Sequence, residues 1–169
     1  MKKSIGILLS LLLMFNLAPN LSAQTTDEEL DQAELLKQLI GTWESEALGD
    51  TVISLLISPH NNGLYGVQEN RVHGNTIGTY KVSIGLSDDK KMIIQTYLGP
   101  DGTIVLDLGK FVTKNTFVID RYRGNTTHAM AQGIWEISPN SFKISFKVRG
   151  EGMTWPNDWT PLATFKRAD

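Results

Sequence analysis

The sequence predicts an all-β protein, a closed up-and-down antiparallel barrel of about ten strands with one short N-terminal helix. Segments rich in Val, Ile, Thr, Phe and Tyr recur along the chain, separated by a turn signal roughly every ten residues. No second helix is long enough for the crossover that parallel strands need. The alternative is an antiparallel sandwich. Because many short up-and-down strands leave exposed edges unless the sheet closes, closure is favoured.

Residues 1–23 have the pattern of a signal peptide. Lys2 and Lys3 form a basic start, residues 5–13 are apolar, and residues 21–23 (Leu-Ser-Ala) give a cleavage site before Gln24. The competing interpretation, a membrane anchor, is disfavoured because the apolar run is short and is followed by polar residues and a proline. We therefore expect an exported protein, periplasmic or secreted, with one domain over residues 24–169 and no membrane anchor after cleavage.

Composition narrows the classes of partner. The chain has no cysteine, which excludes disulfides, thiolate metal sites and a lipid anchor through a thioether. Beyond the leader, 14 Lys and Arg residues oppose 18 Asp and Glu residues, a net charge of −4. This mild acidity argues against nucleic acid or an anionic lipid surface as the main partner.

Residues 24–40 are predicted to form an amphipathic helix. Thr26 at the N-cap and Glu29 three residues later make a capping box. Gly41 is expected to end the helix and to allow a sharp turn into the first strand. The apolar face of this helix consists of Leu30, Ala33, Leu36 and Ile40.

From residue 42 onward, apolar residues alternate with polar ones. The predicted strands are residues 42–47, 52–58, 64–72, 76–84, 92–98, 103–111, 116–122, 128–137, 141–149 and 162–167. In two strands the alternation predicts which side chains face inward. These predicted inward residues are Phe142, Ile144, Phe146 and Val148 in one strand, and Ile104, Leu106 and Leu108 in the other.

The first and last strands carry a matching pair of features. Residues 39–43 read Leu-Ile-Gly-Thr-Trp, and Arg167 stands near the end of the last strand. With these residues the chain resembles the calycin superfamily, most closely the small bacterial secreted lipocalin-like domains. The resemblance implies that Trp43 plugs one end of the barrel and that Arg167 packs across it, or Lys166 if the strand phase shifts by one. The functional end would then be the opposite one.

No cofactor or metal is expected. Haem-binding barrels with the same opening need an axial histidine, and here His60 and His73 lie in turn-like segments, whereas His128 starts a strand. The sequence has no His-x-His, no His-Glu-x-x-His and no acidic loop with calcium spacing.

Three acidic residues, Asp107, Asp120 and Glu136, interrupt otherwise apolar strands. Two carboxylates close together inside a barrel can act as an acid–base pair, one of them with a raised pKa. The alternative is that they face solvent or pair with neighbouring basic residues such as Arg121, and alternation favours this for Glu136. In an intermediate case, a buried Asp120 paired with an arginine anchors the polar head of a ligand.

Residues 150–161 form the one long irregular stretch, and it contains Met153, Trp155 and Trp159. These side chains can form an aromatic platform at the barrel mouth for an apolar or sugar ligand. The alternative is a lid or plug that folds back on the barrel. The candidate ligand site combines these three residues with Asp120, Tyr97 and Tyr122.

Three functions remain open at this point. The leading hypothesis is a non-catalytic binding protein for a small, largely apolar molecule, an inference that rests on fold analogy. The second is a lyase or isomerase that uses Asp107, Asp120 and a tyrosine as acid–base groups. The third is a periplasmic module that binds or inhibits another protein through the acidic residues 24–31 or through the tryptophan loop.

Overall fold

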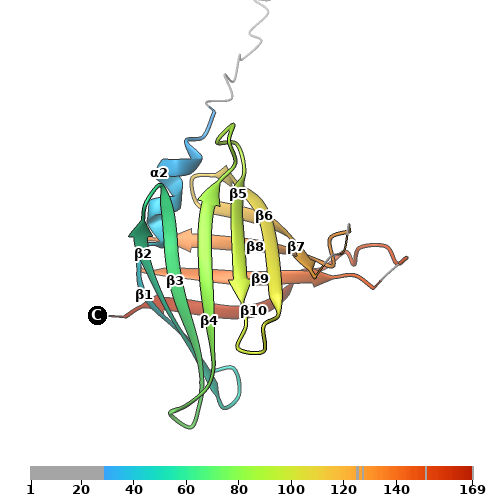
Figure 1. Ribbon diagram of the computed structural model, residues 1–169. Coiled ribbons are helices and arrows are strands. Elements are labelled where there is room, and N and C mark those ends of the chain that lie inside the picture. Colours follow the sequence, from blue (N-terminus) through green and yellow to red (C-terminus); the bar gives the residue numbers. More distant parts are fainter. Residues whose placement is uncertain (1–28, 125, 127, 151, 169) are drawn as a thin grey trace, which may run out of the picture.

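In the computed structural model, which describes residues 29–124, 126, 128–150 and 152–168, the chain forms a closed antiparallel β-barrel with a short helix (Figure 1). Each strand pairs with the next along the chain, and β1 pairs with β10 to close the sheet. The strands are β1 (Gly41–Ser45), β2 (Thr51–His60), β3 (Gly63–Val72), β4 (Asn75–Leu86), β5 (Ile93–Leu98), β6 (Ile104–Thr113), β7 (Thr116–Arg123), β8 (Ala131–Ser138), β9 (Ser141–Val148) and β10 (Thr160–Arg167). The predicted fold class is confirmed. The proposed signal peptide, residues 1–23, lies outside the described residues.

The turns follow the expected chemistry. β3 and β4 are joined by His73 and Gly74, both with positive φ (49° and 79°). Two residues of positive φ match the right-handed twist of the flanking strands and form a tight hairpin. The sequence predicts a turn between these two strands because Gly74 stands there.

The helix differs from its predicted range. It begins at Gln32, as α2 (Gln32–Leu36), and continues as the 3-10 turn η1 (Lys37–Leu39). Its N-cap is Asp31, whose carboxylate accepts bonds from the backbone N–H groups of Ala33 and Glu34. Residues 29–31 are not helical, so the predicted continuous helix over residues 24–40, with Glu29 in its capping box, is wrong. The predicted start at residue 24 and the predicted N-cap Thr26 lie outside the described residues. Asp31 is the N-cap of this helix because its carboxylate reaches two N–H groups of the first turn that have no partner within the helix.

A buried glutamine fixes this helix to the barrel. The Gln32 side chain donates to the Phe111 carbonyl at 3.1 Å and accepts from the Phe111 N–H at 2.7 Å. Leu36 and Leu39 are buried beneath the helix. Figure 1 shows α2 over one end of the barrel, beside the β2–β3 turn, and we call this the helix end. The far end is the opposite one, bounded by the β3–β4 and β5–β6 turns.

Aromatic side chains fill the half of the barrel next to the helix end. Trp43 packs edge-on against Phe142 at 4.9 Å between ring centroids, and Phe142 stacks on Phe165 at 4.6 Å and on Trp135 at 5.4 Å. Phe117 packs edge-on against Trp135 at 5.7 Å. Because these rings are in direct contact, the half of the barrel next to the helix end is a close-packed core.

Arg167 lies across the Trp43 indole, with its guanidinium carbon 4.2 Å from the ring centroid. It donates to the carbonyl of Ile40 at 2.9 Å and to that of Pro139 at 3.2 Å. The Trp43 Nε1 donates to the Leu39 carbonyl at 2.9 Å. The neighbouring Lys166 instead forms an exposed ion pair with Glu46.

The residues of β6 that face the barrel interior are not the predicted ones but those that alternate with them. Asp107 and Gly109 are buried on the inner face with Phe111, whereas Ile104 is exposed and Leu108 faces outward. The prediction failed because both faces of this strand carry apolar residues. Packing of Phe111 on Phe117, with ring centroids 5.1 Å apart, accompanies this phase.

The inward face of β9 agrees with the prediction over most of its length. Phe142 and Ile144 are buried, and Phe146 packs against the core. Val148 is the exception, since it is 65% exposed at the end of the strand. Among the described residues, no helix has the length and apolar character needed to cross a membrane.

Candidate functional site

A cavity of about 200 Å³ occupies the barrel interior in the half toward the far end. Its aliphatic wall includes Ile53, Leu55 and Ile144, and the indole of Trp135 and the ring of Phe165 separate it from the packed half. The polar side chains at its wall are Gln68, Tyr80, Tyr97 and Arg121. It is thus a mostly apolar pocket with a few polar groups, the usual constitution of a small-molecule site.

A buried ion pair stands at the wall of this cavity. Asp107 on β6 and Arg121 on β7 are paired in register, so their side chains point inward next to each other. The Arg121 Nε donates to Asp107 Oδ1 at 2.8 Å and its Nη2 donates to Oδ2 at 2.7 Å. Asp107 has no exposed surface, whereas the Arg121 side chain keeps 27%. The two-pronged geometry compensates both charges within the barrel.

Two aromatic rings hold the guanidinium in place. Its central carbon lies 4.7 Å from the ring centroid of Phe146 on β9 and 5.4 Å from that of Tyr97 on β5. Arg121 therefore reaches across the interior from β7 between side chains of two other strands. A cation over aromatic faces gains electrostatic stabilisation, which grows when the group is desolvated.

Burial changes the proton affinities of two groups at this site. It raises the pKa of the Asp107 carboxyl above its usual value, an effect that Arg121 opposes. Burial, together with the negative charge of Asp107, also raises the pKa of the Tyr97 hydroxyl. Tyr97 therefore remains a neutral phenol, and its hydroxyl donates to Gln95 Oε1 at 3.2 Å.

Two buried hydrogen-bond donors lack a partner among the described residues. They are the indole Nε1 of Trp135, a residue that lines the cavity with other atoms of its ring, and the side-chain Nε2 of Gln95, a residue that does not line it. Trp135 is 3% exposed and Gln95 has no exposed surface. A buried donor without a partner costs free energy, and such groups are uncommon in folded proteins. Neither nitrogen has surface that a molecule in the cavity could reach.

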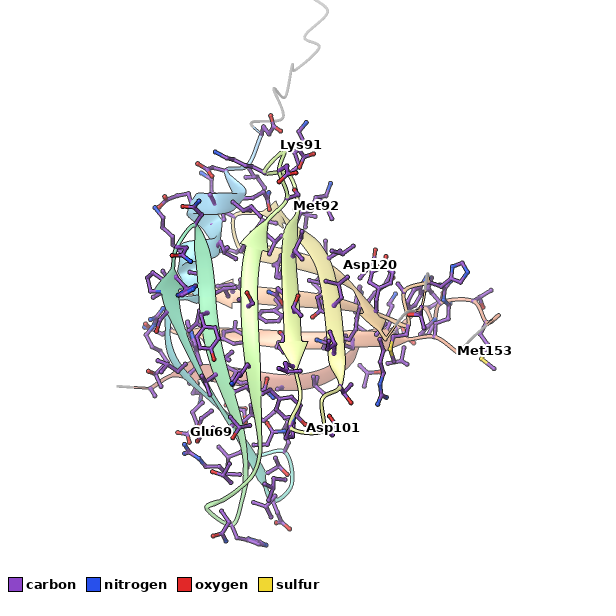
Figure 2. All side chains as sticks on the ribbon, in the orientation of Figure 1. Glu69, Lys91, Met92, Asp101, Asp120 and Met153 are labelled. Atoms are coloured by element: carbon purple, nitrogen blue, oxygen red, sulfur yellow. The ribbon has the colours of Figure 1, made fainter. Side chains whose placement is uncertain are left out.

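The structure separates the candidate residues that the sequence grouped together. Tyr97 lines the interior cavity, but Asp120 and Tyr122 alternate with Arg121 and lie on the outer face of β7. Asp120 accepts a hydrogen bond from Gln132 Nε2 at 3.0 Å on that outer wall (Figure 2). The expectation of a buried Asp120 paired with an arginine is not met, since the buried carboxylate beside an arginine is Asp107.

The tryptophan loop does not reach the interior cavity. Met153 is 68% exposed at the tip of a loop that extends away from the barrel (Figure 2). The guanidinium carbon of Arg149 lies 4.3 Å from the ring centroid of Trp155. The ammonium nitrogen of Lys147 lies 4.7 Å from the ring centroid of Trp159. Trp159 lines a groove of about 280 Å³ on the outer wall, together with Asp120, Gln132 and Met92. Asp120 and Trp159 are therefore brought together, but outside the barrel.

Sequence reasoning missed Gln95 and Trp135 and treated Arg121 only as a partner for a carboxylate. A signal was present in the chain, because Gln95, Asp107 and Arg121 interrupt the apolar segments of three successive strands. Their register makes Gln95 the neighbour of Asp107, and Asp107 the neighbour of Arg121. An aligned polar row of this kind is visible once the strand registers are known.

The histidines lie apart from the cavity. His60, His73 and His128 are all exposed, and the residues that line the cavity do not include them. Among the residues that the structure describes, no group of three or more His, Asp or Glu side chains is arranged to hold a metal ion.

Comparisons with known proteins bear on the fold. No family model and no curated protein matches the sequence. Among solved structures, the crystal structure of Rv2717c from M. tuberculosis matches with a TM-score of 0.60 and 13% sequence identity, over 83% of this chain and 99% of that one. At this identity the likeness shows the fold alone. Together with the closed ten-stranded barrel, it fits a calycin-like fold.

Proposed function

We propose that this chain is an exported, lipocalin-like binding protein that holds one small, largely apolar molecule inside its barrel. The observation that carries the proposal is the interior cavity of about 200 Å³, with aliphatic and aromatic walls and an ion pair at one side. It lies in the half of the barrel away from Trp43 and Arg167, the half that the packed aromatic residues leave free.

An acid–base mechanism has less support. Asp107 and Asp120 lie on opposite faces of the barrel wall, so they do not form a carboxylate pair. Both oxygens of Asp107 are held by Arg121, so they have no free position beside a substrate, and burial raises the pKa of the Tyr97 hydroxyl further from neutral pH. The arrangement fits binding better than proton transfer.

The binding proposal is tested by filling the cavity. Ala163 is buried and lines it, so Ala163→Phe places a ring inside the pocket. Leu56→Phe is the matched control, because Leu56 is 50% exposed on the outer wall. Native mass spectrometry of protein purified from its own host should detect a bound small molecule in the wild type and in the control, and none in Ala163→Phe. Ligand-free wild-type protein, or ligand retained by Ala163→Phe, would contradict the proposal.

Export is tested separately. Cleavage after Ala23 predicts that the intact mass of the protein from the periplasm or medium corresponds to residues 24–169. Recovery of the full-length mass, starting at Met1, from the cytosolic fraction alone would contradict export without affecting the binding proposal.

A further inference from the structure

We infer that the cavity takes a ligand with a carboxylate head, which the free edge of the Arg121 guanidinium holds while the apolar body lies along the wall formed by β2 and β10. The inference rests on the proposed function and specifies the chemical class of the ligand. It follows from the donors of Arg121 that remain free, from the sign of the charge that the cavity presents and from the position of its apolar side chains.

Arg121 keeps hydrogen-bond donors that Asp107 does not use. A guanidinium carries donors on all three of its nitrogens, and Asp107 accepts only from Nε and Nη2. Among the described residues Nη1 has no hydrogen-bond partner, and it is not one of the buried nitrogens that lack one. It therefore keeps exposed surface. Because Arg121 lines the cavity and its side chain is 27% exposed, a molecule in the cavity can reach this nitrogen.

The free edge of the guanidinium has the geometry that a carboxylate requires. Nη1 and the remaining N–H of Nη2 can donate two parallel hydrogen bonds to the two oxygens of one carboxylate. The other edge is held by Asp107, and the rings of Phe146 and Tyr97 lie 4.7 and 5.4 Å from the guanidinium carbon. Arg121 is thus fixed before a ligand arrives, so little side-chain freedom is lost on binding.

The cavity presents the positive member of the ion pair. Among the described residues that line it, Arg121 is the one with a charged side chain. Asp107 has no exposed surface and does not line the cavity, so a ligand meets the cation and not the carboxylate. Since Arg121 is partly exposed, an anionic head bound to it stays near solvent, which limits the cost of its desolvation. An anionic head is therefore favoured over a neutral one, and a cationic head is disfavoured.

The apolar side chains lie on another part of the wall. Ile53 and Leu55 come from β2, and Leu162 and Ala163 come from β10, whereas Arg121 is on β7. Leu162 is 48% exposed, so this apolar wall continues from the interior to the surface. A ligand with its head at Arg121 covers these side chains with its body and gains free energy from their burial. The cavity thus specifies the head of the ligand and does not limit the length of its body.

The test uses three probes with the same eight-carbon chain: octanoate, 1-octanol and octylammonium. Titration calorimetry at pH 7 should give octanoate about tenfold tighter binding than octanol, because its charged head accepts the stronger hydrogen bonds. Octylammonium should bind most weakly. Octanol that binds as tightly as octanoate, tightest binding of octylammonium, or no binding of any probe would overturn the inference. The proposed function is decided separately by the native mass spectra of the wild type and Ala163→Phe, so the two can fail independently.

A double variant assigns the preference to Arg121. Asp107→Leu/Arg121→Met removes the guanidinium without leaving a buried charge, and it should lose the preference for octanoate over octanol. Arg149→Met is the matched control, because Arg149 lies over Trp155 and does not line the cavity, and it should retain the preference. A preference that survives in the double variant, or that disappears in Arg149→Met, contradicts the role of Arg121.

A further variant, Asp107→Asn, removes the negative charge and keeps an oxygen that Arg121 can bind. Its affinity for octanoate should rise about tenfold relative to the wild type, since the cation is no longer shared with a second carboxylate, and its affinity for octanol should stay within about twofold. Unchanged octanoate affinity in folded Asp107→Asn protein would contradict the electrostatic argument. If either of the Asp107 variants does not fold, the wild-type probe series still decides the inference.

Discussion

The guanidinium of Arg167 occupies the space that a side chain at position 41 would need. A Cβ built on Gly41 would lie 2.3 Å from Arg167 Nη1, and the φ angle of Gly41 is 140°. The backbone at position 41 and the arginine across Trp43 are therefore mutually dependent. Glycine is required here both by conformation and by contact with the plug.

Gly41→Ala should lower the free energy of unfolding by about 1–3 kcal/mol, because alanine is strained at this φ and displaces the arginine. Urea denaturation followed by tryptophan fluorescence measures the change. Gly85→Ala is the matched control, since nothing lies within 4 Å of a Cβ at that position. Equal effects of the two substitutions would contradict the dependence on Arg167.

Arg167→Met should destabilise the barrel by about 1–3 kcal/mol. It removes the cation over Trp43 and the charged donor to the carbonyls of Ile40 and Pro139. Lys166→Met, the adjacent control, breaks only an exposed ion pair with Glu46 and should cost less than about 1 kcal/mol. The midpoints of urea unfolding for the two variants give the comparison, and a larger loss in Lys166→Met would refute the assignment.

Arg121→Met should destabilise the protein by about 3–5 kcal/mol at neutral pH, because it leaves the Asp107 carboxylate buried and uncompensated. The loss should be smaller in acid. Burial already raises the pKa of Asp107 above its usual 3.8, and removal of the opposing cation raises it further. A carboxyl with a raised folded-state pKa favours folding at low pH, and this contribution is lost as the pH rises through the raised value.

Unfolding of wild type and Arg121→Met at pH 4.5 and pH 8 tests the sign. The stability difference between them should be larger at pH 8. The double variant Asp107→Leu/Arg121→Met should recover most of the loss at both values, because no buried charge remains. A difference that grows toward acid pH would show that another group governs the effect.

The fold was readable from the sequence because turn residues and strand alternation act locally. Every predicted strand overlaps an observed one, and the hairpin at Gly74 lies at its predicted place. The site was harder to read, because it depends on strand phase. β6 carries apolar residues on both faces, so alternation alone could not reveal that Asp107 faces inward beside Arg121. Likewise, the exposed position of Met153 depends on the direction of a loop that no local pattern encodes.

Two places could bind the ligand, the interior cavity and the tryptophan loop, and substitutions in each distinguish between them. Trp155 and Trp159 stack on Arg149 and Lys147 and do not line the cavity. Trp155→Ala and Trp159→Ala should therefore change the affinity for a small apolar probe such as ethylbenzene by less than about twofold, which corresponds to a difference in binding free energy of about 0.4 kcal/mol. Ala163→Phe should abolish binding in the same titration, since its ring takes the place of the ligand. If the loop variants lose binding and Ala163→Phe keeps it, the ligand site is the outer groove beneath Trp159, where Asp120 also lies.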